Sequence, residues 1–290
     1  MYTIQNEFLT VTVAGRGAEL QSILGADGTE YLWQGDPAYW PDRALNIFPY
    51  VARLTDGVYC LDDQQYAMKI HGFAKNCVFT LLSNTGTELL LELRDSPETL
   101  RQYPRRFVFR VRYILDGRTI RITYEVENRD TRMLYFGLGG HPGFQVPLEA
   151  GKRFEDYRLH FGKPCSPKRV DFTEDCFRAG TCSDYPLQDG QNLPLRHGLF
   201  DDDAIILQEM ARSVTLEPVE GGHSVTVSYP DMPYLGIWHC PKTDAPYVCL
   251  EPWCALPSLA GKRTVFEEQE DLLRLEPGKQ YSNTWEITVS

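Results

Sequence analysis

Two histidines and one glutamate stand in sequence settings where an ionisable side chain could transfer protons. His141 lies in the run GGHPGF at 139–144, where glycines allow another group to approach the backbone closely and proline disfavours a helix. His71 lies in a similar run, KIHGFA at 69–74. We expect both rings to be held on turns and presented to a ligand. The alternative for each is a loop or core histidine that is bonded only to backbone.

Glu251 is the most notable carboxylate, because its neighbours in VCLEPWC at 248–254 are almost all apolar. A buried glutamate costs free energy unless it is paired, and burial raises its pKa toward a value useful for a general base. The alternative is a structural acid in a salt bridge.

Arg53 and the acidic run Asp201–Asp203 are further candidates for binding a ligand. Arg53 follows the apolar stretch FPYVA at 48–52, which makes it a candidate for a buried pair. The three aspartates precede another apolar run, Ala204 to Leu207, although a triple acid at such a place is often only a solvated loop.

Other kinds of chemistry have little support. The glycine-rich run at 137–143 fails the dinucleotide pattern, since the third glycine position is Pro142, and the P-loop, serine-hydrolase and zinc-protease motifs are absent. A zinc site at His239, Cys240, Cys249 and Cys254 fits poorly, because only the last two approach the usual ligand spacing. We expect free thiols and no metal.

The elements that must position these residues are strands. Apolar and polar residues alternate in Leu9–Val13, Phe107–Tyr113 and Ile120–Val126, and the run 283–289 is again strand-like. Asp116-Gly117 between two alternating runs predicts a hairpin with a type I′ turn.

Helix signals are sparse. The run SPETLRQ at 96–102 predicts one short helix, with Ser96 as N-cap and Pro97 in the first turn. The region 164–200 is rich in Pro, Gly and Asp and indicates long loops over a sheet framework. Together the patterns predict one all-β domain over residues 1–290, a large antiparallel β-sandwich.

Composition agrees with a globular protein. The chain has 290 residues, 42% of them hydrophobic and 24% charged, and a formal charge of −11 from 29 basic and 40 acidic residues. This acidic balance argues against nucleic acid as a partner. Residues 1–14 lack the features of an export signal, and no apolar run reaches the roughly 18 residues of a membrane span. We therefore expect no membrane partner and a cytoplasmic location.

Six short runs, taken together and in this order, resemble the aldose 1-epimerases (galactose mutarotases), and within them the compact LacX-like branch. The resemblance spans almost the whole chain. The runs are YLWQ at 31–34 with Tyr39-Trp40, NIFP at 46–49 through Arg53, HGFA at 71–74, GHPGF at 140–144, Leu199-Phe200 through Asp203-Ala204, and LEPW at 250–253.

This resemblance implies a galactose mutarotase-like supersandwich that interconverts the α and β anomers of a free aldohexose. It implies Glu251 as the general base on the C1 hydroxyl and His141 as the general acid on the ring oxygen. His71 and Arg53 resemble the residues that bind the sugar near the ring oxygen, and Asp203 the residue that binds its hydroxyls. One base and one acid suffice for this reaction, so no cofactor is expected, and the expected partner is a small sugar.

Some points stay open at this level. The larger galactose mutarotases have Asn before the arginine, whereas this chain has Ala52. Asp202 is an alternative to Asp203. A sugar-binding protein without turnover, glycoside cleavage by Glu251 and Asp203, and a hexose phosphate clamped by Lys69 or Lys75 are alternative functions. The sequence leaves the aldose and the oligomeric state open.

Overall fold

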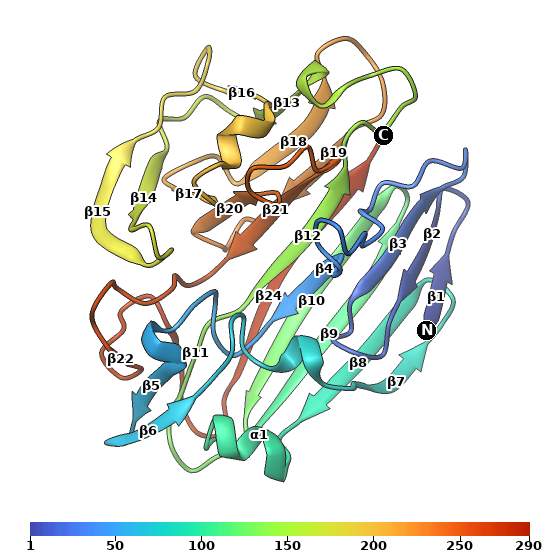
Figure 1. Cartoon of the computed structure of the whole chain (residues 1–290). Coiled ribbons are helices and arrows are strands. Elements are labelled where there is room, and N and C mark those ends of the chain that lie inside the picture. The colour runs from blue at the N-terminus through green and yellow to red at the C-terminus, as the bar shows by residue number, and fades with distance from the viewer.

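Two large antiparallel sheets pack face to face in the computed structural model, which describes all residues 1–290 (Figure 1). The nine-stranded sheet has the order β16 (Asn192–Pro194), β13 (Tyr157–Phe161), β18 (Ser213–Pro218), β19 (Val225–Ser228), β24 (Gln280–Val289), β10 (Thr119–Asn128), β9 (Phe107–Asp116), β8 (Glu88–Arg94) and β7 (Thr80–Asn84). The seven-stranded sheet has the order β15 (Arg178–Asp184), β14 (Lys168–Phe172), β17 (Ile205–Gln208), β20 (Tyr234–Trp238), β21 (Tyr247–Trp253), β12 (Gly139–Gln145) and β4 (Ala44–Ile47).

Smaller elements surround these sheets. They are the sheet β1 (Tyr2–Gln5), β2 (Leu9–Val13) and β3 (Leu20–Gly25), the sheet β22 (Thr264–Val265), β5 (Val58–Leu61) and β6 (Gln64–Ala67), the pair β11 (Leu134–Phe136) and β23 (Leu273–Leu275), the helix α1 (Pro97–Gln102), and four 3₁₀ turns at Thr55–Gly57, Ala74–Asn76, Phe154–Asp156 and His197–Phe200. No helix is long and apolar enough to cross a membrane.

The core between the large sheets explains why alternate residues of β9, β10 and β24 are apolar. It is a cluster of 72 buried residues drawn from both large sheets and from the smaller elements around them. Asn46 on β4 accepts a hydrogen bond from Tyr124 on β10, and a Cβ added at Gly140 on β12 would lie 2.5 Å from Trp285 on β24. The two sheets therefore meet at β4 and β12, and the other face of these strands is left for a site.

Several of the predicted elements are confirmed. Helix α1 begins after Ser96, whose side chain accepts from the Thr99 amide, with Pro97 at the first turn. Strands β9 and β10 form the expected hairpin. The turn type is different, because only Gly117 of the two connecting residues has positive φ, which fits a type II′ turn rather than type I′.

The interpretation of 164–200 as loops was incomplete, because β14, β15 and β16 lie there. Strand β15 is the edge of the seven-stranded sheet, and its side chains are almost all exposed. It pairs through its backbone with β14 and buries no apolar face, so it shows no hydrophobic alternation.

Candidate active site

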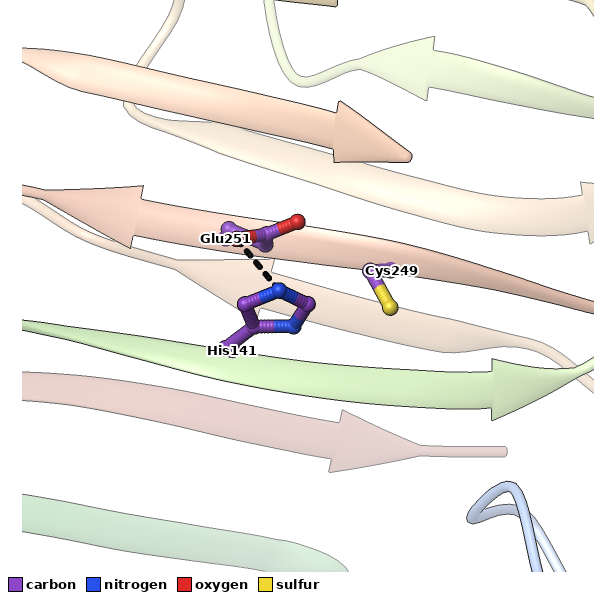
Figure 2. Close-up of side chains that lie close together, drawn as sticks. All are labelled: His141, Cys249 and Glu251. Carbon is purple, nitrogen blue, oxygen red and sulfur yellow. Dashed lines mark ion pairs between the residues drawn. The ribbon is translucent and has the colours of Figure 1, made fainter. Parts of the chain in front are cut away.

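His141 and Glu251 lie side by side on two neighbouring central strands (Figure 2). Strand β12 pairs with β21 at Gly139–Trp253 and again at Gly143–Cys249, and continuing this register places His141 opposite Glu251. On the far side of Glu251 its partner is Gly236 of β20, where an added Cβ would lie 3.2 Å from the Cβ of Glu251. The glutamate therefore has a histidine on one side and a glycine, which leaves room for it, on the other.

The prediction that His141 sits on a turn was wrong, because the run 139–145 is a buried strand. Its glycines serve close packing: an added Cβ at Gly139 would lie 2.6 Å from Trp253, and one at Gly143 would lie 3.1 Å from Trp40. Pro142 cannot donate to a ladder, and the pairing of β12 with β21 is interrupted around it.

The His141–Glu251 pair is buried and closely spaced. Nε2 of His141 lies 3.1 Å from Oε2 of Glu251, and the two side chains are 8% and 2% exposed. This distance is that of an ion pair, but the two atoms are not aligned for a hydrogen bond. The other ring nitrogen, Nδ1 of His141, has no hydrogen-bond partner. Burial raises the pKa of Glu251 well above its usual value, with a smaller contribution from the Asp203 carboxylate. Burial lowers the pKa of His141 to about 3.

These opposed shifts mean that the pair holds one proton at pH values between the lowered pKa of His141 and the raised pKa of Glu251. Desolvation penalises the charged form of each group, so the empty site favours a protonated Glu251 beside a neutral His141. The alternative arrangement, a carboxylate beside an imidazolium, has the same number of protons. Because the groups are in contact, their titrations belong to the pair.

His71 is held in a strained turn beside this pair. Its φ is +62° and that of Ala52 is +55°, and the two residues bond each other: the His71 amide donates to Ala52 O, and the Ala52 amide donates to Nδ1 of His71 at 3.3 Å. Nδ1 is thus an acceptor, which leaves Nε2 as the N–H donor of a neutral ring. Burial lowers the pKa of His71, and the nearby His141 lowers it further. The turn predicted for this histidine is confirmed.

A cavity of about 230 Å³ opens over these residues, on the outer face of the seven-stranded sheet. It brings together all five residues singled out from the sequence: His71, His141, Glu251, Arg53 and Asp203. The remaining lining residues are Trp40, Asp42, Leu45, Ala52, Ile70, Lys75, Phe172, Cys176, Asp202, Ala204, Ile206, Trp238, Trp253 and Pro257. A larger depression of about 520 Å³ beside Arg178 and residues 262–271 contains none of the five.

Asp203 is fixed at the rim by an interaction that the sequence did not reveal. Trp238 Nε1 donates to Asp203 Oδ1 at 2.8 Å, and Arg53 approaches the other oxygen at 3.9 Å. Asp203 has a φ of +75° and is half-buried, whereas Asp202 also lines the cavity but is exposed. Of the two acids, Asp203 is the one with a fixed orientation.

If the protein acts on a sugar, as the family resemblance implies, Asp203→Asn should raise KM for that sugar by about 10- to 100-fold, since a hydrogen bond to a charged group contributes about 1.5–3 kcal/mol. Asp202→Asn is the matched comparison and should change KM by no more than about twofold, as is usual for surface substitutions. Steady-state kinetics of both variants checks this. The reverse ranking would assign the contact to Asp202.

Trp40 covers one face of His141. The two rings stack with centroids 4.8 Å apart and an interplanar angle of 30°, and Trp238 meets His141 edge-on at 5.8 Å. No hydrogen bond to Nδ1 fixes the plane of the imidazole ring, so the stacked indole of Trp40 must do so. The indole face also attracts an imidazolium. Trp40 belongs to one of the six runs, but neither it nor Trp238 was given a role, since no local pattern separates them from core tryptophans.

The eight cysteines are free, as expected. Cys254 exchanges hydrogen bonds with the backbone of Leu138, and His239 contacts His197 at 3.2 Å and the carbonyl of Cys240. The only group of three or more possible metal ligands in the chain is a different one, His141, Cys249 and Glu251.

The fold is of the galactose mutarotase-like class. The structure superposes on that of a galactose mutarotase related enzyme from Lactobacillus acidophilus with a TM-score of 0.95 and 31% identity, covering 100% of this chain and 97% of the other. A galactose mutarotase-like protein from Lactobacillus casei gives 0.93 and 32%, covering 100% of both chains.

The chain belongs to the aldose 1-epimerase family, whose model matches residues 1–288. It is also 33% identical to the chromosomal Protein LacX of Lactococcus lactis subsp. lactis, over 99% of this chain and 98% of that protein. The resemblance inferred from six short runs is therefore confirmed along the whole chain.

Proposed function

We propose that the protein is an aldose 1-epimerase that interconverts the α and β anomers of a free aldohexose, with Glu251 as general base and His141 as general acid. The observation that carries this proposal is the buried pair 3.1 Å apart, facing a cavity that His71, Arg53 and Asp203 also line. Family membership gives the reaction class.

In the proposed reaction the sugar binds with its C1 hydroxyl toward Glu251 and its ring oxygen toward His141. The carboxylate takes the hydroxyl proton, the C1–O5 bond breaks to give the aldehyde, and the imidazolium protonates O5. Rotation about C1–C2 presents the other face of the aldehyde. Ring closure then runs the two proton transfers in reverse, and the pair regains its starting state.

Binding must shift the shared proton from Glu251 to His141. The empty site favours the neutral arrangement, whereas a sugar hydroxyl that donates to Glu251 stabilises the carboxylate. Stacking on Trp40 stabilises the resulting imidazolium. Nε2 of His141 and Oε2 of Glu251 are 3.1 Å apart, so a small reorientation that aligns them for a hydrogen bond is enough for the proton to pass between them.

A neutral sugar offers no charge to bind, so its orientation must come from hydrogen bonds. We assign His71 Nε2–H and Arg53 as donors near the ring oxygen, and Asp203 as the acceptor for sugar hydroxyls. The indoles of Trp40, Trp238 and Trp253 supply flat apolar walls for the C–H faces of the ring.

The charged lining favours an uncharged substrate over a hexose phosphate. Two cations, Arg53 and Lys75, face the acids Asp42, Asp202 and Asp203, so the cavity has no excess of positive charge. Lys69 is exposed and lies outside the lining. Lys75 forms no ion pair within 4.0 Å, which is the observation that favours an anionic sugar as the second candidate.

Polarimetry of freshly dissolved α-glucose, α-galactose and their 6-phosphates tests the proposal. The protein should accelerate the approach to equilibrium of a free hexose. Acceleration of a 6-phosphate alone would favour the second candidate. Calorimetric binding without acceleration would indicate a binding protein, and release of nitrophenol from an aryl glycoside would indicate glycoside cleavage.

The pH dependence follows from the shared proton. Activity requires one proton on the pair, and the depressed pKa of His141 puts the gain of a second proton near pH 3. We therefore expect no acid limb at the ordinary histidine pKa of about 6.5. On the acid side kcat/KM should fall only toward about pH 3, and on the basic side it should fall as pH rises through the raised pKa of Glu251. An acid limb near 6.5 would contradict the single-proton pair.

A further inference from the structure

Cys249 forms a compact cluster with the His141–Glu251 pair. Cys249 and Glu251 are alternate residues of β21, so their side chains point to the same side of the sheet, beside His141 of β12 (Figure 2). One nitrogen, one sulfur and one carboxylate oxygen lie within 4.8 Å of one another. All three residues are buried, with 6%, 0% and 2% of His141, Cys249 and Glu251 exposed.

Two polar atoms of this cluster have no hydrogen-bond partner. They are Nδ1 of His141 and Oε2 of Glu251, both out of contact with solvent. Oε2 lies 3.1 Å from Nε2 of His141 without hydrogen-bond alignment. Because buried polar atoms are normally paired, an ion bound between Oε2 and Nε2 would supply the partner that Oε2 lacks. Mutarotation uses neither Nδ1 nor the thiol.

We propose that His141, Cys249 and Glu251 bind a thiophilic divalent cation such as Zn²⁺, and that the bound ion blocks the sugar site. The ion accepts one nitrogen, one sulfur and one oxygen, a donor set that Zn²⁺ tolerates and Mg²⁺ and Ca²⁺ do not. Binding is independent of the mutarotase proposal, whereas inhibition rests on it.

Charge balance supports an ion in this buried place. A thiolate and a carboxylate supply two negative charges, a neutral imidazole supplies none, and a divalent cation makes the sum zero. The proton of the Cys249 thiol and the proton shared by His141 and Glu251 both leave to solvent as the ion binds, so two protons are released. The result is a neutral complex, which a low-dielectric site accommodates better than an isolated charge.

The geometry needs only a small adjustment. Zinc ligand atoms at about 2.0–2.3 Å from the metal lie about 3.3–3.8 Å apart in a tetrahedron, and the 3.1 Å between His141 and Glu251 is near that range. The Cys249 sulfur lies within 4.8 Å of the other two ligand atoms, so at most it must move about 1 Å closer to them. Gly143 lies opposite Cys249 and has no side chain to obstruct this movement.

The ion would enter through the sugar cavity, which His141 and Glu251 line and behind which Cys249 lies. A zinc site with three protein ligands keeps its fourth position open for water or substrate, and here that position faces the cavity. Sugar and metal therefore compete for the same pair.

The test uses Co²⁺ and Zn²⁺ with the full-length protein. We expect Co²⁺ to give a thiolate charge-transfer absorption, and calorimetry in two buffers of different ionisation enthalpy to report release of two protons per Zn²⁺. Cys249→Ala should abolish the absorption and weaken Zn²⁺ binding by more than about tenfold, since loss of a direct ligand should exceed the effect of losing an outer partner. Cys254→Ala, the loss of another fully buried thiol, is the matched control and should retain both.

Inhibition is read separately, as the Zn²⁺ concentration that halves each variant's own mutarotation rate. This Zn²⁺ concentration should rise with sugar concentration in the wild type, and in Cys249→Ala it should be more than about tenfold higher than in the wild type. No thiolate absorption, equal Zn²⁺ affinity in the wild type and Cys249→Ala, or binding only at millimolar Zn²⁺ would overturn the metal site. Clear binding in a protein without mutarotase activity would retain the site and reject the proposed function.

Discussion

Glu251→Gln should lower kcat for mutarotation by about 10³-fold, within the 10²- to 10⁴-fold range of general acid–base catalysis. Glutamine has nearly the same shape and can still accept a hydrogen bond from the C1 hydroxyl, but it cannot take the proton. The sugar should therefore bind with a Kd within a few-fold of that of the wild type. Polarimetry gives the rate and calorimetry gives the binding.

Thermal unfolding provides the control for folding. Burial raises the pKa of Glu251 above its usual 4.5, so the folded protein binds its proton more tightly than the unfolded chain does. The stability from this proton is full below about pH 4.5 and is lost as pH rises through the folded-state pKa. Glutamine does not ionise, so the variant does not lose this stability as pH rises. Its Tm should equal that of the wild type near pH 4 and exceed it near pH 8, by about 2–4 °C for each kcal/mol gained. A lower Tm at both pH values would mean that the lost activity reflects damage to the fold.

His141→Asn should lower kcat by about 10²- to 10⁴-fold, because the ring oxygen then leaves without a proton donor. Removal of the histidine also takes away the partner of Glu251 and one face of the Trp40 stack. We therefore expect the acid limb near pH 3 to disappear. The variant should retain sugar binding by calorimetry.

The double variant distinguishes a cooperating pair from two independent groups. If His141 and Glu251 share one proton, removing both should cost little more than removing either, because residues that act as a unit are not additive. Losses that multiply would contradict the shared proton. A His141→Asn variant with wild-type kcat would remove the histidine from the mechanism altogether.

The five residues singled out from the sequence line one cavity, but the backbone setting of His141 was predicted wrongly. Glu251 was recognisable because a carboxylate among apolar residues costs free energy unless it is paired. The structure places it in the cavity beside His141. His141 was placed on a turn because Gly and Pro usually indicate turns. The glycines instead make room for Trp253, Trp285 and Trp40, which come from distant parts of the chain.

Other features could not be found without the fold. Trp238 orients Asp203 across 35 residues of sequence, and Cys249 meets His141 only because β12 and β21 are neighbours. The sheet framework was predictable where one face of a strand is buried, as in β9, β10 and β24. Edge strand β15 has no buried face, so its sequence lacked the signal.

Exchange spectroscopy at equilibrium tests the central proposal most directly. With ¹³C1-labelled glucose or galactose, nuclear magnetic resonance measures transfer between the α and β signals with no net reaction and no coupled assay. We predict that the wild type strengthens the exchange peaks in proportion to its concentration. Neither Glu251→Gln nor His141→Asn should raise these peaks above the enzyme-free level. Equal acceleration by the wild type and both variants would contradict the assignment of the reaction to the His141–Glu251 pair.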